Sequence, residues 1–250
     1  MGLNKIELRN DLPGGKIIDN YTPRQLKELS KKYGVEILTI NALQKFNLSA
    51  ILPETIMELK KLITLSLSIG CKAIVLCPNN DVNDKRGSEE IFEETVKALK
   101  SFGSLFQDSG MQGYLEPLGF EECSLRSIVI AMKAIQESGY PVYKTVHDTF
   151  HHHIGPDTFD TIENDYDISY TGLVHISGVE YNIPVEEYRD NHRVLVTAQD
   201  RLQTKEQIEL LLKIGYVGNI SFEPFSKTIQ EMEIEKIKSA INHSIEYISN

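Results

Sequence analysis

The 250-residue sequence has few cysteines, no long apolar run and little positive charge. Its three cysteines, Cys71, Cys77 and Cys123, are an odd number without paired spacing, which favours reduced thiols and a cytoplasmic protein. No stretch approaches the roughly 18 consecutive apolar residues of a membrane-spanning helix. The opening residues, MGLNKIELRNDLPGG, lack the basic segment and apolar run of a signal peptide. We therefore expect neither a membrane segment nor a secretory leader.

Positive charge is also scarce. The formal net charge is −10 and the pI is about 5.2. A protein that binds nucleic acid needs a basic surface to neutralise phosphates, so a nucleic-acid partner is not expected. No low-complexity segment or Pro/Gly-rich linker interrupts the chain. Residues 1–250 are therefore predicted to form a single domain, of a length that is common for one α/β barrel.

Short apolar runs alternate with longer helical patterns along the chain. The runs predict strands at 5–9, 35–40, 72–77, 113–116, 142–147, 174–177 and 219–223. The helical patterns predict helices at 23–33, 53–69, 88–103, 124–137, 204–215 and 227–248. No glycine-rich phosphate loop follows any strand, which argues against a Rossmann or P-loop fold. The alternation predicts an α/β fold of the TIM-type (β/α) barrel class, with seven recognisable strands where such a barrel normally has eight.

Ionisable residues stand at the ends of four consecutive predicted strands. In a parallel barrel the carboxyl ends of the strands form the catalytic mouth. Three carboxylates and one imidazole suit a divalent cation such as Mn²⁺, Mg²⁺, Co²⁺ or Zn²⁺. Buried together, the carboxylates would repel one another without a cation, so at least one should have a raised pKa. The pattern predicts one metal centre, formed by Glu116, Asp148, His175 and Glu223.

The residues around these strand ends form recognisable motifs. They read YLEPLGF at 114–120, HDTFHHH at 147–153, LVHISGVE at 173–180, RDNHRVL at 189–195, ISFEPF at 220–225 and, less specifically, LTINALQKFN at 38–47. In these motifs the chain resembles the xylose isomerase-like TIM barrel family of sugar isomerases and epimerases. Within that family it looks most similar to the 2-keto-myo-inositol (inosose) isomerases.

The resemblance implies roles for individual residues. The four strand-end residues match the family's metal ligands, and two of them, Glu116 and Glu223, would also act as catalytic acid and base. Substrate contacts are implied for His151, Arg193 and Glu122.

The other histidines of the sequence KTVHDTFHHHIGPDTFD match no functional residue of the family. His152 and His153 are interpreted as loop residues. His147 precedes Asp148 and should point to the opposite side of its strand, as a hydrogen-bonded histidine of the barrel.

The implied reaction is isomerisation or epimerisation of a small sugar or cyclic polyol ketone. Proton transfer would pass through an enediolate, stabilised by one divalent metal ion. This places the protein in carbohydrate metabolism, with inositol catabolism as the nearest pathway. The implied partner is a small molecule, with no membrane and no nucleic acid, and a homodimer is left open.

Two features depart from the family pattern. Family members begin with a strand and a helix ahead of the stretch that matches NKIELR, so the first βα unit is expected to be absent from this barrel. The family often has a glycine-rich turn after the arginine, whereas this chain reads VLVTAQDRLQT. The loop on that side of the site should therefore differ.

Two other interpretations stay open. A chain without the first βα unit could be a catalytically decayed relative that only binds a sugar or a protein partner. Zinc-dependent abasic-site endonucleases share this barrel and part of the ligand set, and Asp190 and His192 resemble one of their pairs. However, no histidine precedes His147, and Cys77 stands where an earlier strand would supply one.

Overall fold

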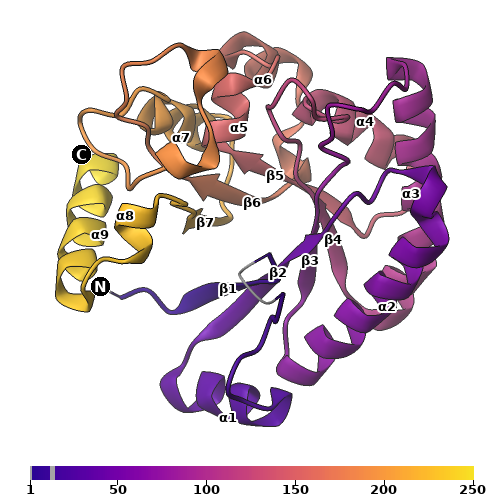
Figure 1. The fold of residues 1–250 in the computed structure, drawn as a ribbon, viewed down its shortest axis with the longest axis horizontal. Coiled ribbons are helices and arrows are strands. Elements are labelled where there is room, and N and C mark those ends of the chain that lie inside the picture. Colours follow the sequence, from indigo (N-terminus) through magenta and orange to yellow (C-terminus); the bar gives the residue numbers. More distant parts are fainter. Residues whose placement is uncertain (1, 12–14) are drawn as a thin grey trace.

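The computed structural model describes residues 2–11 and 15–250, and within them seven parallel strands form one sheet. The spatial order of the strands follows the chain, and the sheet curves into a nearly closed barrel with helices outside it (Figure 1). This confirms the predicted TIM-type (β/α) barrel with seven strands. The strands are β1 (Lys5–Arg9), β2 (Glu36–Leu43), β3 (Ala73–Leu76), β4 (Gln112–Leu115), β5 (Tyr143–Asp148), β6 (Thr171–Ile176) and β7 (Asn219–Phe222).

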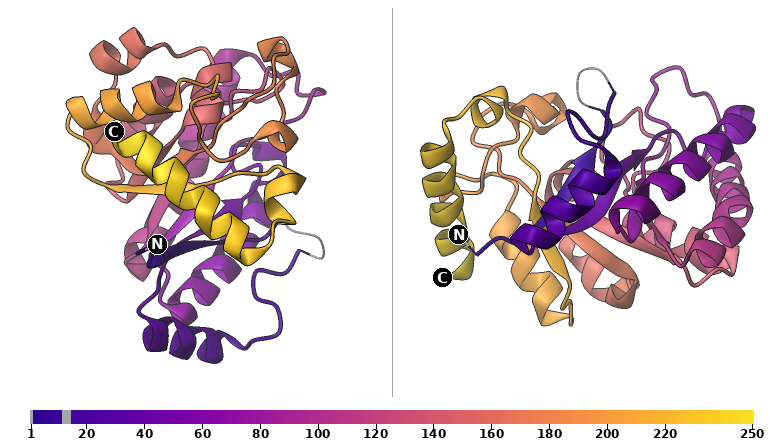
Figure 2. Two further views of the ribbon diagram at one scale, coloured as in Figure 1. Left: turned by 90° about the vertical axis from the view of Figure 1, so that its left-hand side faces the viewer. Right: turned by 90° about the horizontal axis from the view of Figure 1, so that it is seen from below.

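Helices connect the strands and cover the outside of the sheet (Figures 1 and 2). Among the described residues, no helix is both long and apolar enough to cross a membrane. The α-helices are α1 (Pro23–Tyr33), α2 (Leu52–Ile69), α3 (Ser88–Ser109), α4 (Ile128–Ser138), α5 (Thr149–Ile154), α6 (Phe159–Asp165), α7 (Thr204–Lys213), α8 (Lys227–Gln230) and α9 (Ile234–Ser249). Short 3₁₀ turns are η1 (Ser49–Ile51), η2 (Ile168–Tyr170), η3 (Val185–Glu187) and η4 (Asp190–His192).

The prediction of one long terminal helix was wrong. The chain turns between α8 and α9, where Glu233 has an extended backbone. The turn lets Ile229 of α8 bury its side chain, while α9 runs past the open side of the sheet (Figure 2). Residues in α5 and α6 were not predicted as helical, because each helix is too short to show a 3.6-residue apolar period.

Apolar side chains fill the barrel below its mouth. Val146 and Leu173 lie two residues before Asp148 and His175 on the same strand faces, and they pack with Val75 in the barrel interior. Larger apolar residues on the outer face of the sheet pack under α2, α3 and α4. The ionisable strand ends therefore rest on an apolar floor.

Strand register aligns the side chains at the mouth. Asp148 on β5 pairs with His175 on β6, and His175 pairs with Ser221 on β7. Leu76 on β3 pairs with Leu115 on β4, so Glu116 begins the loop directly above the sheet. Because the strands are parallel, all these positions lie at the same end of the barrel.

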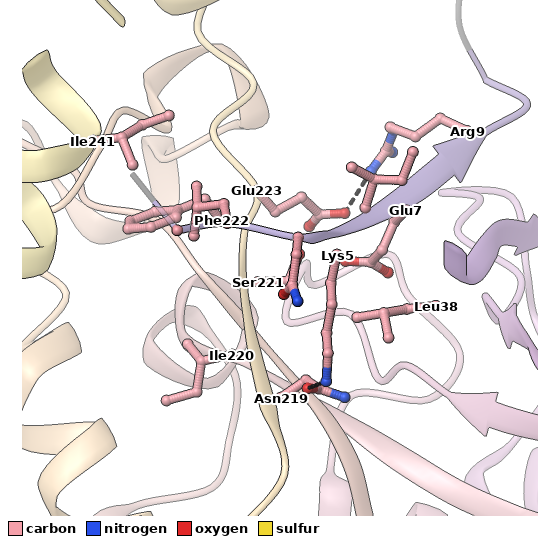
Figure 3. A pocket seen from close by; sticks show the side chains of 14 residues that line it. Lys5, Glu7, Arg9, Leu38, Asn219, Ile220, Ser221, Phe222, Glu223 and Ile241 are labelled. Carbon is pink, nitrogen blue, oxygen red and sulfur yellow. Dashed lines mark hydrogen bonds and ion pairs between the residues drawn. The ribbon is translucent and has the colours of Figure 1, made fainter. Parts of the chain in front are cut away.

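β1 and β7 are the two edges of the sheet, and side chains join them (Figure 3). Lys5 Nζ donates a hydrogen bond to Asn219 Oδ1 at 2.6 Å, and Arg9 Nη1 donates to Glu223 Oε1. A cavity of about 400 Å³ lies between the two strands and is bordered by Ile241 of α9. We call this region the β1–β7 seam.

Candidate metal centre

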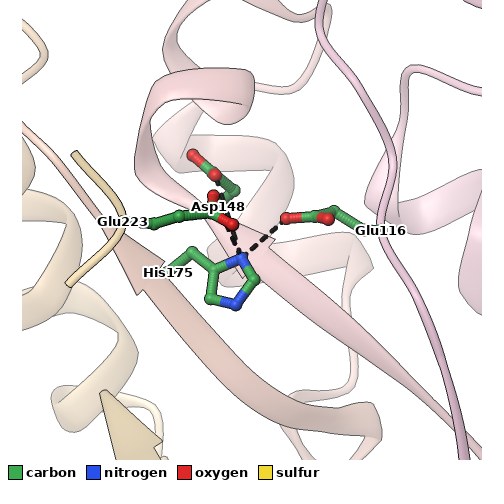
Figure 4. A group of neighbouring side chains, drawn as sticks. All are labelled: Glu116, Asp148, His175 and Glu223. Atoms are coloured by element: carbon green, nitrogen blue, oxygen red, sulfur yellow. Dashed lines mark hydrogen bonds and ion pairs between the residues drawn. The ribbon is translucent and has the colours of Figure 1, made fainter. Parts of the chain in front are cut away.

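Four side chains from four neighbouring strands converge at the mouth of the barrel. One ligand atom from each of Glu116, Asp148, His175 and Glu223 lies within 4.8 Å of all the others. The carboxylates gather on the Nδ1 side of the imidazole (Figure 4). Nδ1 of His175 lies 2.7 Å from Glu116 Oε1, 3.4 Å from Glu223 Oε2 and 4.0 Å from Asp148 Oδ2.

Arg193 lies against two of these carboxylates. Its Nη2 donates to Asp148 Oδ2 at 2.6 Å and to Glu223 Oε2 at 2.8 Å. The guanidinium is 1% exposed and lies 4.9 Å from the centre of the Phe150 ring and 4.7 Å from that of Phe225. An arginine buried this deeply needs carboxylate partners, because a bare charge would be strongly disfavoured.

The pKa values of three groups in the cluster depart from their ordinary values. Burial raises the pKa of Glu223 to about 7, although His175 and Arg193 both favour its charged form. This confirms the expectation that one carboxylate has a raised pKa. Burial would also raise the pKa of Asp148, but Arg193 and the neighbouring histidines outweigh it and hold that pKa well below its ordinary value. Burial disfavours the charged form of His175, yet the surrounding carboxylates raise its pKa well above the ordinary value.

The donor set and its charge both fit a divalent cation. Three carboxylates and one imidazole are the donors that such ions take in proteins. The carboxylates of this cluster, together with that of Glu7, outnumber the guanidinium groups of Arg9 and Arg193 by two. A cation bound through Nδ1 would require the neutral form of His175 and would displace the proton that the carboxylates favour. In that form the cluster carries the excess negative charge that a divalent ion would neutralise.

His151 lies next to the cluster, on the first turn of α5. Asp148 caps this helix, because its Oδ1 accepts from the backbone N–H of Phe150 at 2.7 Å and of His151 at 3.2 Å. His151 Nδ1 accepts a hydrogen bond from the backbone N–H of Gly119 at 3.2 Å. Burial lowers the pKa of His151 below its ordinary value. The ring is therefore neutral near pH 7 and carries its proton on Nε2, as a hydrogen-bond donor.

The interpretation of His152 and His153 as loop residues was wrong. His152 and His153 belong to α5, and the His152 ring packs 4.9 Å from that of His147. His147 is buried and its Nε2 lies 3.0 Å from Gln207 Oε1, as expected for a histidine on the opposite side of its strand. Short helices after a strand give little sequence signal, so the helical placement was missed.

Glu122 lies apart from the four converging side chains. It lines a separate cavity of about 240 Å³ with Phe120, Arg126 and Arg189. The link to the cluster is indirect: the Phe120 ring packs 5.2 Å from the His151 ring.

Glu7 and Arg9 of β1 were not predicted to be part of the site. Glu7 contacts the far nitrogen of His175, at 3.1 Å from Nε2, and Arg9 pairs with Glu223. One sequence feature could have indicated their role: in the strand KIELR, Lys5, Glu7 and Arg9 alternate with apolar residues. Charged residues on the inner face of a barrel strand indicate a functional face, but the same pattern also describes an exposed edge strand.

The pair that resembles an endonuclease motif does not join the cluster. Asp190 Oδ1 accepts from Arg193 Nη1 at 3.3 Å, and the His192 ring packs against Tyr181. In the described part of the chain, neither residue belongs to a group that could hold a metal ion.

A parallel barrel with ionisable groups at its strand ends has the architecture of enzymes that work at this face of the fold. The profile of the xylose isomerase-like TIM barrel family matches residues 1–249, and the chain belongs to that family. The inosose isomerase of Halalkalibacterium halodurans is 24% identical over an alignment of 251 positions, which covers 99% of this chain and 88% of the relative.

Solved structures give the same family relationship. A xylose isomerase domain-containing protein from Salmonella typhimurium LT2 has a TM-score of 0.91 and 39% identity, over 99% of this chain and 88% of that one. An IolI protein with a bound zinc atom has a TM-score of 0.88 and 21% identity, over 98% and 88% of the two chains. These relatives confirm the resemblance found in the sequence.

Metal addition should stabilise the protein. Millimolar Mn²⁺, Co²⁺ or Zn²⁺ should raise the melting temperature by about 5–10 °C if its concentration is near 100 times Kd, and EDTA should reverse the rise. Differential scanning fluorimetry measures this shift. Glu116→Gln should abolish most of it, whereas the same exchange at an exposed carboxylate on α3, Glu89→Gln, should not. An equal shift in both variants would place the ion elsewhere.

The half-buried imidazole of His152 should make the fold sensitive to acid. Burial lowers the pKa of this imidazole from 6.5 to about 3. Below pH 6.5 the unfolded chain takes up a proton that the folded chain does not, so stability falls as the pH falls from 6.5 towards 3. His152→Phe, which keeps a ring against Phe159, should reduce the loss of melting temperature between pH 7.5 and pH 5 by a few degrees. His243→Gln, at an exposed position on α9, is the control and should behave like the wild type.

Proposed function

We propose that this protein is a divalent-metal-dependent isomerase or epimerase of a sugar or cyclic polyol ketone, acting by proton transfer through an enediolate. The observation that supports this most is the convergence of four ligand atoms within 4.8 Å of one another, with a neutral histidine and an arginine beside them. When bound, the cation would supply Lewis-acid stabilisation of negative charge that develops on substrate oxygens.

Glu223 and Glu116 are the proposed acid and base. A carboxyl group with a pKa near 7 can both accept and release a proton at neutral pH, and Glu223 has that property. Glu116 approaches His175 Nδ1 from a different strand, so the two carboxyl groups come from different sides of the cluster (Figure 4). That placement suits removal of a proton by one group and its return by the other. Asp148 and His175 are proposed as ligands only.

Substrate contacts are proposed for His151, Arg193 and Glu122. The Nε2–H of a neutral His151 can donate to a carbonyl or hydroxyl oxygen without adding charge to the site. Arg193 holds Asp148 and Glu223 in place, and as a permanent cation it can also stabilise an oxyanion. Glu122 would contact a more distant substrate hydroxyl through its cavity beside Phe120.

The proposed substrate is uncharged, and inosose is the first candidate because a curated relative carries that name. A divalent ion would balance the excess negative charge of the cluster, which leaves no surplus positive charge for a phosphate. A cytoplasmic location is part of the proposal, since Cys71, Cys77 and Cys123 are free and buried.

Solvent exchange in D₂O tests the proposed reaction directly. The protein loaded with Mn²⁺ or Co²⁺ is incubated with 2-keto-myo-inositol and with a panel of ketoses, and ¹H NMR follows loss of the proton on the carbon next to the ketone. We expect exchange and product with at least one substrate, and neither after chelation. Substrate binding without any exchange would instead identify a sugar-binding protein.

His175 and Arg193 should fail in different ways when replaced by alanine. His175→Ala removes a ligand and should lose both metal binding and turnover. Arg193→Ala removes a counter-charge from Asp148 and Glu223, so the metal-free protein should melt lower and the rise on adding Mn²⁺ should exceed that of the wild type. Its kcat/KM should fall on the order of 10²-fold or more if the guanidinium stabilises the oxyanion. Full turnover of Arg193→Ala would limit this arginine to a structural role.

A further inference from the structure

The two nitrogens of His175 face different partners. Nδ1 faces the carboxylates of the candidate metal centre, and Nε2 lies 3.1 Å from both carboxylate oxygens of Glu7. Glu7 is on β1, the edge strand of the sheet, and its side chain is only 11% exposed. The contact therefore joins the first strand of the barrel to a strand near its other edge.

Other contacts fix the Glu7 carboxylate. The hydroxyl of Thr39 on β2 donates to Glu7 Oε2. Glu7 lines the cavity of the β1–β7 seam, between Lys5 and Arg9, which both make contacts across to β7 (Figure 3). A carboxylate held on a strand by a neighbouring hydroxyl is well placed to orient a ring.

We propose that Glu7 is a positioning residue for His175. By accepting a hydrogen bond from Nε2–H, it keeps the proton on that nitrogen and directs the Nδ1 lone pair into the metal centre. The inference rests on the proposed metal centre and adds to it a residue for which the sequence motifs implied no role. In most metal sites, a histidine that binds the metal through one nitrogen donates its other N–H to a carboxylate or carbonyl. This hydrogen bond fixes the tautomer and the orientation of the ring, and its loss weakens metal affinity.

Two other states of the His175 ring would prevent metal binding, and Glu7 disfavours both. Without an acceptor at Nε2, a neutral imidazole can place its proton on Nδ1, which removes the lone pair needed for a metal. The ring could also turn about its side-chain bond and point either nitrogen elsewhere. Glu7 opposes both changes, and its negative charge makes the bonded Nε2–H more favourable than a neutral acceptor would.

Metal affinity measured on a graded set of variants tests the proposal. Co²⁺ binding is followed by its visible absorption, and Zn²⁺ affinity by competition with a chromophoric chelator. Glu7→Ala should bind Co²⁺ about 10–100-fold more weakly than the wild type. Glu7→Gln should recover part of this loss, because its amide oxygen still accepts from Nε2–H. Lys5→Met is the matched control: it lies on the same face of β1 and loses only contacts outside the cluster, to Asn219 and Glu36, so its affinity should be unchanged.

Each other outcome has a definite meaning. Unchanged affinity in Glu7→Ala would overturn the positioning role while leaving the proposed metal centre intact. Equal losses in Glu7→Ala and Glu7→Gln would also overturn it, because they would show an effect of charge alone. No Co²⁺ binding by the wild type would remove the metal centre itself, and the inference with it.

A spectroscopic measurement covers the case in which Glu7→Ala does not fold. In the zinc-loaded wild type, ¹⁵N NMR of the His175 ring should show a protonated, hydrogen-bonded Nε2 and a metal-bound Nδ1. Glu7→Gln should shift the Nε2 resonance towards that of a weaker hydrogen bond. An unaltered ring spectrum in Glu7→Gln would count against the proposal.

Discussion

The crowding of carboxylates around the ring of His175 is the constraint on which the mouth of this barrel depends. Glu116, Asp148 and Glu223 face one nitrogen, and Glu7 faces the other. Negative groups this close and this buried cannot coexist without compensating charge. The surrounding structure supplies part of that compensation through two guanidinium groups. Arg193 is buried between the rings of Phe150 and Phe225, and the half-buried Arg9 stacks on Phe225. The charge that remains is what makes a divalent cation the expected occupant.

The same charges also hold the barrel together where backbone pairing stops. β1 and β7 are the edges of the sheet, and the contacts between them are polar or ionic: Lys5 with Asn219 and Arg9 with Glu223. Glu223 is therefore both a candidate ligand and part of the closure. In a barrel closed by backbone hydrogen bonds these two roles would be separate. Here any change in the charge of Glu223 acts on the site and on the seam together.

The sequence was sufficient for the fold and for the four converging residues, for a physical reason. Parallel strands buried on both faces are short apolar runs, and an ionisable residue at the end of such a run stands out, as Glu116 does after YL and His175 after LV. Glu7 and Arg9 gave no such signal, since alternating charges on a first strand also describe an exposed edge. The sequence likewise could not show that Arg193 would turn back onto Asp148 and Glu223, because 45 and 30 positions separate these partners along the chain.

The candidate ligands lie on strands and the proposed substrate groups lie in loops, and this difference bears on how substrates could differ within the family. The candidate ligands lie on strands or at their ends, where register fixes them relative to one another. The proposed substrate groups Glu122 and Arg193 lie in the segments after β4 and β6, which strand register does not fix. A structure with only 21% identity keeps a TM-score of 0.88, so the scaffold tolerates extensive sequence change. Differences in those two segments, including the glycine-free stretch after Arg193, can therefore alter the substrate while the strands continue to present the same ionisable groups.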